Sequence, residues 1–167
     1  PAAGLDPATQ TSLAVVRSAY RTALDGFALP YGDVAVGGWR NTPYVVIQNV
    51  GAYLDTPRFL DGDHPVKSAE DAEAYLQRLA AMGDQLDGEL KRLQQAGGRG
   101  LVAPDFLLDK AIAQLGRTIA DAETPQNAMV QSLVSRTRTI PGDWQRRAGA
   151  IVARLVIPAL SRHPDEL

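Results

Sequence analysis

Hydrogen-bonding side chains gather in one short stretch of the sequence, PYVVIQNVGAYLDTPRFL. Tyr44, Gln48 and Asn49 can each donate and accept a hydrogen bond, and irregular segments on rigid scaffolds often carry function. If residues 44–54 were helical, Tyr44 and Gln48 would lie one turn apart on the same face. We therefore regard these three side chains as candidates to line a substrate cleft. The alternative is that their apolar neighbours are core and the polar groups point into solvent.

The two histidines, His64 and His163, are far apart in the sequence, and each precedes a proline. Neither belongs to an HExxH pattern, in which two imidazoles one helical turn apart hold zinc. His64 lies in the turn-rich stretch DGDHP and is a further candidate for the cleft, because an imidazole can change its charge near neutral pH. The alternative is a solvated histidine, or one that caps a neighbouring backbone group.

No set of residues forms a complete catalytic or metal-binding motif. Asp61 and Asp63 flank a glycine, but the other ligands of a calcium loop are missing. The acidic residues around Asp71 suit the first turn of a helix, where the helix dipole favours them. GGRG lacks the context of a phosphate loop, no serine lies in GxSxG, and no cysteine is present for a thiolate site. We therefore predict no catalytic residue, no metal ligand and no cofactor in this chain.

Composition limits the class of partner. The net charge of −2 gives no general attraction to nucleic acid, and the longest apolar runs are too short for a membrane span. Arginines concentrate late in the chain, where Asp143 is the only acid in residues 131–163. This cluster is either a contact face for an acidic partner or a solvated helix surface. Its members are Arg136, Arg138, Arg146, Arg147, Arg154 and Arg162.

Apolar residues recur every three or four positions through most of the chain, which is the spacing of one face of an α-helix. Ser68 and Asp71 resemble a capping box at the start of the clearest stripe. Pro158 lies inside the last apolar pattern and should kink or shorten that helix. Helix starts are predicted at Asp6-Pro7, Ser68, Pro104-Asp105 and Thr124-Pro125, and after the break at residues 140–143.

These elements predict a mainly α fold of about five amphipathic helices in an irregular antiparallel bundle. A short hairpin near residues 33–47, built from VAV and YVVI, also fits the glycine- and proline-rich stretch there, and it would need a helical surface behind it. We expect residues 1–167 to form a single helical domain or fragment.

The segment with the hydrogen-bonding side chains also carries a family resemblance. Its elements are a Pro-Tyr-x-Val-x-Gln stretch, a Pro-Arg-Phe-Leu element, a His-Pro turn and an Asp-Ala-Glu-x-Tyr-Leu-x-Arg-Leu helix. Here they lie at residues 43–48, 57–60, 64–65 and 71–79, and APDF at 103–106 and VIPAL at 156–160 follow. In the order of these elements, the chain resembles the bacterial domain-of-unknown-function 885 family over most of residues 40–160.

The resemblance implies a mostly helical protein that looks like a zincin-type metallopeptidase. Members are several times longer than this chain, and their zinc motif, of the kind His-Glu-x-x-x-Gly-His, lies well downstream. This sequence has no such motif, so no metal ligand or catalytic glutamate is carried over to it. The resemblance therefore implies an amino-terminal, non-catalytic portion that forms one wall of a peptide-substrate cleft. Zinc would belong to a carboxy-terminal catalytic half, which is the partner implied for this chain.

The alternative function is an independent helical interaction domain with the arginine cluster as its contact face. A reading frame that continues past Leu167 into a His-Glu motif is expected for the peptidase portion, and a stop codon for the interaction domain. The resemblance also favours a periplasmic or exported protein, because members are often exported. The chain begins at Pro1 rather than methionine, which fits a cleaved export signal, a tag scar or a fragment.

Overall fold

The computed structural model describes residues 4–30 and 42–167, and these are mainly α-helical, as predicted. They belong to two units, Pro1–Tyr44 and Val45–Leu167, and each unit is described by itself. Most of the hairpin expected near residues 33–47 lies outside the described residues.

The first unit contains helix α1, Pro7–Phe27. Its start is the predicted one: the Asp6 carboxylate accepts the backbone N–H groups of Ala8 at 3.0 Å and of Thr9 at 3.1 Å. These bonds satisfy amides that have no partner inside the helix. The apolar side chains along α1 are largely exposed, with Leu24 at 67%.

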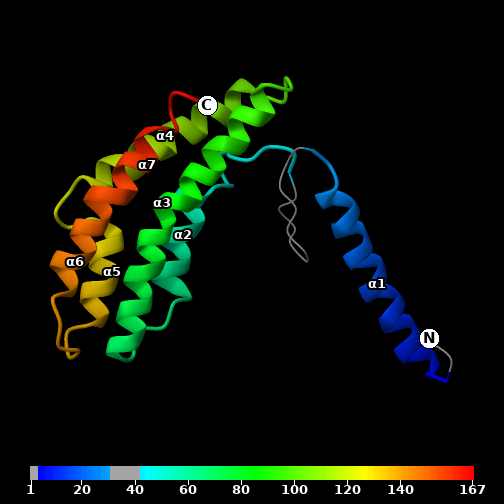
Figure 1. Ribbon diagram of the computed structural model, residues 1–167, viewed down its shortest axis with the longest axis horizontal. Helices are drawn as coiled ribbons and strands as arrows, with labels where there is room; N and C mark the ends of the chain where they lie inside the picture. Colours follow the sequence, from blue (N-terminus) through cyan, green and yellow to red (C-terminus); the bar gives the residue numbers. More distant parts are fainter. Residues whose placement is uncertain (1–3, 31–41) are drawn as a thin grey trace. The chain divides into compact units, whose positions relative to one another are not determined.

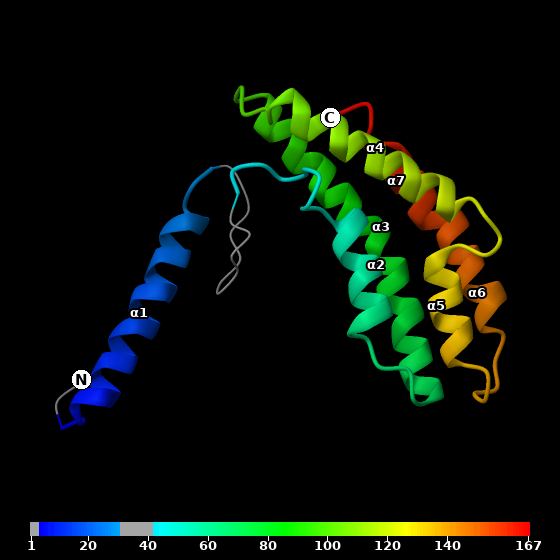
Figure 2. The ribbon, with the colours of Figure 1, turned by 180° about the vertical axis from the view of Figure 1, so that it is seen from behind.

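The second unit is a helical bundle in which α3 contacts α2 on one side and α6, η1 and α7 on the other (Figures 1 and 2). Helix α5 packs against α2 and α6, while α4 packs against α5 and α7. The elements are α2 (Ala52–Gly62), α3 (Ala69–Gly97), α4 (Asp105–Ala122), α5 (Ala128–Arg136), α6 (Trp144–Ile151), the π-helical η1 (Val152–Val156) and α7 (Ile157–Ser161).

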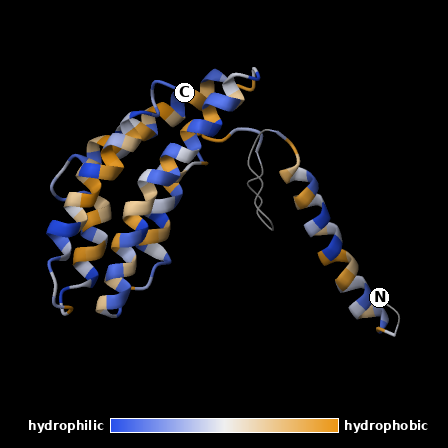
Figure 3. Cartoon of the chain, in the orientation of Figure 1, coloured by the Kyte–Doolittle hydropathy of each residue, from blue (hydrophilic) through white to orange (hydrophobic). Residues whose placement is uncertain are grey.

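The core of this unit is built from one apolar stripe per helix. Each helix carries both hydrophobic and hydrophilic residues (Figure 3), which is the pattern of an amphipathic helix with a buried side. Tyr75 is fully buried, and its hydroxyl donates to the carbonyl of Met129 at 2.7 Å, so its one polar group is satisfied inside the core. The other large buried side chains include Tyr53, Leu60, Leu79, Met82, Leu86, Leu115, Leu133 and Leu160.

The helix starts follow the predicted capping chemistry, with one correction. Ser68 and Asp71 form the predicted capping box at the start of α3. Helix α5 begins at Ala128 rather than at the predicted Thr124-Pro125. The reason is that Asn127 supplies the cap, since its side chain accepts the N–H of Val130 at 3.0 Å.

Residues 44–51 are not helical, so Tyr44 and Gln48 do not share the helical face that a helix over 44–54 would give. Ile47 and Val50 exchange two backbone hydrogen bonds of 3.0 and 3.1 Å, which closes a tight turn with Gln48 and Asn49 at its tip. Gly51 follows with a φ of 141°, a value that favours glycine. Helix α2, which the sequence analysis did not predict, begins only after this glycine.

Pro158 is accommodated inside a continuing helix. Proline has no N–H to donate and its ring collides with the carbonyl four residues earlier. The five-residue π-helical segment Val152–Val156 lies just before it, and the N–H of Ile157 bonds back to the carbonyl of Val152. This wider turn lets the chain continue into α7 instead of ending at the proline.

Candidate functional site

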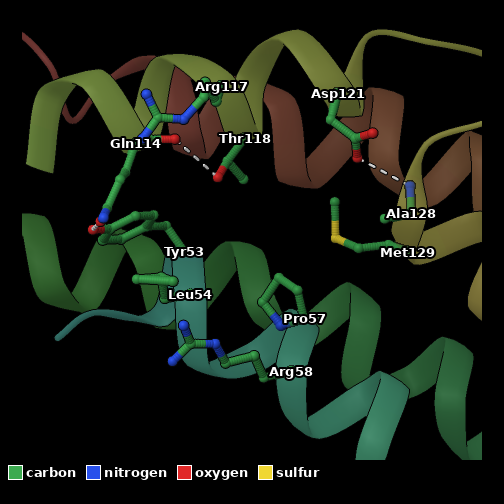
Figure 4. Close-up of a pocket in the computed structure, with 10 residues that line it drawn as sticks. All are labelled: Tyr53, Leu54, Pro57, Arg58, Gln114, Arg117, Thr118, Asp121, Ala128 and Met129. Atoms are coloured by element: carbon green, nitrogen blue, oxygen red, sulfur yellow. Dashed lines mark hydrogen bonds between the residues drawn. The ribbon is translucent and has the colours of Figure 1, made fainter. Parts of the chain in front are cut away.

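A slot of about 390 Å³ lies between α2 and α4, beside the start of α5 (Figure 4). Helix α2 contributes aromatic, apolar and basic side chains, while α4 contributes a polar row and α5 its first two residues. The lining residues are Tyr53, Leu54, Pro57, Arg58, Gln114, Arg117, Thr118, Asp121, Ala128 and Met129. The slot is at the small end of the range that is usual for ligand pockets.

At one end of the slot, a hydrogen bond joins α2 to α4. The hydroxyl of Tyr53 donates to Oε1 of Gln114 at 2.8 Å and lies 3.1 Å from the carbonyl oxygen of Ile47. Burial, with the charge of Asp55 adding to it, raises the pKa of Tyr53 to about 12. The phenol is therefore neutral at physiological pH and holds the two helices together as a donor.

At the opposite end of the slot, a hydrogen bond joins α4 to α5. The carboxylate of Asp121 accepts the backbone N–H of Ala128 at 3.0 Å, which caps the first amide of α5. Met129 is buried beside it and presents its thioether to the slot (Figure 4). Because Asp121 is engaged in this cap, its negative charge is already partly matched by the amino-terminal end of α5.

Two guanidinium groups lie on opposite walls of the slot, Arg58 from α2 and Arg117 from α4 (Figure 4). Both side chains are exposed, and within residues 4–30 and 42–167 neither makes an ion pair or a hydrogen bond. The floor between them is apolar and includes Leu54 and Pro57. The slot therefore combines an apolar surface with two positive charges that lack a counterion among the described residues.

Glu89 of α3 holds the start of α2, the helix that forms one wall of the slot. This glutamate is 5% exposed, and its two carboxylate oxygens lie 2.9 and 3.0 Å from the backbone N–H of Ala52. Gly51, at the cap position of α2, has no side chain that could cap the helix itself. A carboxylate 37 residues away in the sequence therefore takes that role and sets the position of Tyr53 one residue later.

The three polar candidates of residues 44–49 are not in the slot. Tyr44 belongs to the first unit, where its backbone N–H donates to Oγ1 of Thr42 at 3.2 Å. Gln48 is half-buried and Asn49 is exposed, both at the tip of the turn that Ile47 closes. This turn touches the slot only through the carbonyl of Ile47, which contacts the Tyr53 hydroxyl. A role for Tyr44, Gln48 and Asn49 in a substrate cleft stays a prediction.

His64, the fourth candidate, is 3% exposed and has both ring nitrogens engaged. Its Nδ1 lies 3.0 Å from a guanidinium nitrogen of Arg78. A guanidinium can only donate, so Nδ1 accepts, and Nε2 carries the hydrogen that is donated to the carbonyl of Asp71 at 2.9 Å. In this arrangement the ring ties the end of α2 to the start of α3 and has no nitrogen left for a ligand.

The described residues do not fit a zinc ion. Across residues 4–30 and 42–167, no three His, Asp or Glu side chains are grouped so that they could hold a metal. His163 is fully buried, and its Nδ1 is engaged with the carbonyl of Ala159 at 3.0 Å. Its Nε2 makes no hydrogen bond to any described residue. With no carboxylate or second imidazole gathered beside it, this nitrogen is a lone acceptor and not part of a ligand set.

Most of the late arginines have partners on neighbouring helices or nearby in the chain. Arg136 is half-buried and bonds to backbone carbonyls of α2 and the following turn. Arg147 pairs with Glu73 at 2.7 Å, Arg162 pairs with Asp87 at 2.5 Å, and Arg146 pairs with Asp143. Arg138 and Arg154 have no such partner in the described part of the chain. A contact face made from this cluster would therefore have Arg138 and Arg154 as its free charges.

Sequence analysis missed the slot, although part of its signal was present. Gln114, Arg117, Thr118 and Asp121 are spaced by three, one and three residues, which places them on one face of α4. That row of polar residues could have been found beside the apolar stripe of the same helix. The opposing wall could not be predicted, because it requires α2, which contains Pro57 and was not predicted as a helix.

Comparison with protein families finds one that describes the chain along its whole length. The model of the family described as a bacterial protein of unknown function, DUF885, matches residues 1–167. No curated protein and no solved structure matches the chain. Of the helices in the described residues, none combines the length and the apolar character needed to cross a membrane.

Proposed function

Because the chain belongs to the DUF885 family of bacterial proteins, we propose that it is the non-catalytic helical portion of a zinc-dependent metallopeptidase, where it forms one wall of the substrate cleft. The family match over residues 1–167 agrees with the order of motifs by which the sequence resembles this family. The metallopeptidase part of the proposal is what that resemblance implies.

The slot between α2 and α4 supports the same proposal. Peptides present apolar side chains together with polar and charged backbone ends, and a cleft wall that binds them needs both kinds of surface. Leu54 and Pro57 supply the apolar part, while Arg58 and Arg117 supply charge that is not neutralised by a described residue. A surface of this kind suits substrate binding without any chemistry of its own.

The proposal assigns the metal to other residues of the full-length protein. The described residues of this chain offer no set of zinc ligands, and both ring nitrogens of His64 are already engaged. The role of this chain is therefore to bind and orient the substrate, and no step of the hydrolysis is assigned to it.

An assay of the full-length protein tests the proposal. We expect it to hydrolyse peptides, to lose that activity with a chelator and to regain it with zinc. The 167-residue chain by itself is the matched control and should show no hydrolysis. The proposal would be overturned if the full-length protein cleaved no peptide, or if a chelator left its peptidase activity unchanged.

A further inference from the structure

We infer that His163 is an acid-sensitive lock on the residues that follow α7: uptake of a proton by its buried ring releases residues 162–167 from α3, while the helical bundle stays folded. The inference goes beyond the proposed function and does not depend on it. It concerns only the second unit. Three observations carry it: the burial of the ring, its unpaired nitrogen, and the exposed contacts on either side of it.

The ring of His163 is held in its neutral form. It is 0% exposed, and its Nδ1 lies 3.0 Å from the carbonyl oxygen of Ala159. A carbonyl can only accept, so Nδ1 carries the ring hydrogen and Nε2 is left as an acceptor. Among the described residues, this Nε2 is the one buried side-chain nitrogen or oxygen without a hydrogen bond. A proton added there would create a buried cation whose new N–H has no acceptor, which is costly.

The charges around the ring do not offset that cost. Helix α7 contacts α3, α4 and η1, and two charged groups act on the ring that follows it. Asp87 of α3 favours the protonated ring, and Arg162 opposes it. These two side chains are paired with each other at 2.5 Å, so the carboxylate is already engaged. The charged side chains of α4 and η1 are exposed to solvent and do not act on the ring.

The buried ring is the main anchor of residues 162–167 on α3. Arg162 pairs with Asp87 on one side of it, and Oε1 of Glu166 accepts from the side-chain amide of Gln94 at 3.0 Å on the other. Both contacts are open to solvent, where ion pairs and hydrogen bonds contribute little to stability. His163 is the one fully buried side chain of the six residues, so its expulsion would leave only weak contacts.

Release of this segment leaves the bundle intact because the core does not depend on it. Ala159 and Leu160 of α7 are fully buried in the hydrophobic core and precede the segment. Beyond them, only the half-buried Leu167 packs against that core. Segments with so few buried contacts open locally, at a lower free energy than the whole protein needs to unfold.

The direction of the pH effect follows from the two states of the segment. Burial lowers the pKa of His163 below its usual value of 6.5 while the segment is bound, and the released segment regains the usual value. The released state therefore binds more protons, and release grows as pH falls below about 6.5. Between pH 7.5 and pH 5.0, the equilibrium constant for release should rise by up to about 30-fold.

Amide hydrogen exchange, followed by NMR on the 167-residue chain, tests the inference. The probe is the N–H of Glu166, which donates to the carbonyl of His163 at 3.1 Å when the segment is bound. After correction for the intrinsic pH dependence of exchange, we expect its protection factor to fall at least about tenfold between pH 7.5 and pH 5.0. The amide of Met82, in the middle of α3, should fall by less than about twofold.

Two substitutions assign the effect to one ring. In His163→Gln, which cannot titrate, the protection of the Glu166 amide should be the same at both pH values. His64→Gln is the matched control: it removes the other buried histidine and should keep the full pH dependence at Glu166.

The inference would be overturned by an unchanged Glu166 protection factor in the wild type, or by an equal fall at Met82, which would mean global unfolding. It would also be overturned by a pH dependence that survives in His163→Gln. If that variant did not fold, the comparison of Glu166 with Met82 in the wild type would still decide. No measurement here needs metal or peptide hydrolysis, so its outcome is independent of the proposed function.

Discussion

Replacing Arg136 by methionine should destabilise the second unit strongly, because this arginine caps a helix to which it does not belong. It lies at the end of α5, and its guanidinium donates to the carbonyl of Leu60 at 2.7 Å and to that of His64 at 2.8 Å. Leu60 is in the last turn of α2, where carbonyls have no partner within the helix and the dipole is negative. A positive charge is the best available partner for them.

The size of the effect follows from these two bonds. Hydrogen bonds to a charged group contribute about 1.5 kcal/mol each when the group is only half-buried, so Arg136→Met should cost about 3 kcal/mol. With a urea slope of about 2 kcal/mol/M, the unfolding midpoint should fall by about 1.5 M. Arg136→Lys should lose about half as much, since one ammonium keeps the charge but cannot reproduce the fork that reaches both carbonyls.

Urea unfolding followed by circular dichroism measures these differences. The matched control is Arg138→Met, two residues further on, which removes an exposed guanidinium without a described partner and should change stability by less than about 0.5 kcal/mol. If Arg136→Met proved as mild as Arg138→Met, the carbonyls of Leu60 and His64 would not depend on this side chain. The explanation given for the half-buried arginine would then be wrong.

Three further perturbations test other parts of the structure. Gly83→Val should destabilise the protein by about 2 kcal/mol or more in urea unfolding, because a Cβ at Gly83 would already stand 3.1 Å from the carbonyl oxygen of Leu155. Gly88→Ala, in the same helix with open space around it, should instead stabilise by about 0.5–1 kcal/mol, and equal effects of the two changes would refute this packing. Burial lowers the pKa of His163 below its usual value near 6.5, so the unfolded state binds the proton first and the free energy of unfolding should fall as pH drops below about 6.5. The His163→Gln variant should lack this part of the pH dependence of stability. If the difference in unfolding free energy between wild type and His163→Gln did not vary with pH, the lowered pKa of His163 would be contradicted. The raised pKa of Tyr53, about 12, means that its stabilising contribution persists up to pH about 10 and is lost as pH rises through about 12. Tyr53→Phe should remove one tyrosinate absorbance transition near that pH, and a loss near pH 10 instead would show that the hydroxyl is not buried in this way.

The helices that could be predicted from the sequence are those whose signals are local. Asp6-Pro7 and Ser68 with Asp71 place capping groups within three residues of the amides they satisfy, and the apolar stripes of α1, α3 and α4 repeat at helical spacing. These signals do not depend on any distant part of the chain. The correction at α5 is also local, because two capping side chains compete there and Asn127 has the geometry to accept from Val130.

The features that could not be predicted depend on contacts between distant residues. Helix α2 contains Pro57, a residue that usually interrupts helices. The backbone N–H of its first residue is bound by Glu89 of another helix, so the sequence of α2 itself contains no capping signal. Arg136 resembled its neighbours Arg138 and Arg146 in sequence, and only its bonds to residues 72 and 76 positions away distinguish it as structural. The slot likewise exists only because the folded unit brings α2 and α4 to its two sides.

Zinc analysis of the full-length protein is the most direct test of the function proposed for this family member. We expect about one zinc ion per full-length chain together with chelator-sensitive peptide hydrolysis, and none bound to the 167-residue chain purified in the same way. A full-length protein that is free of metal and cleaves no peptide would contradict the account.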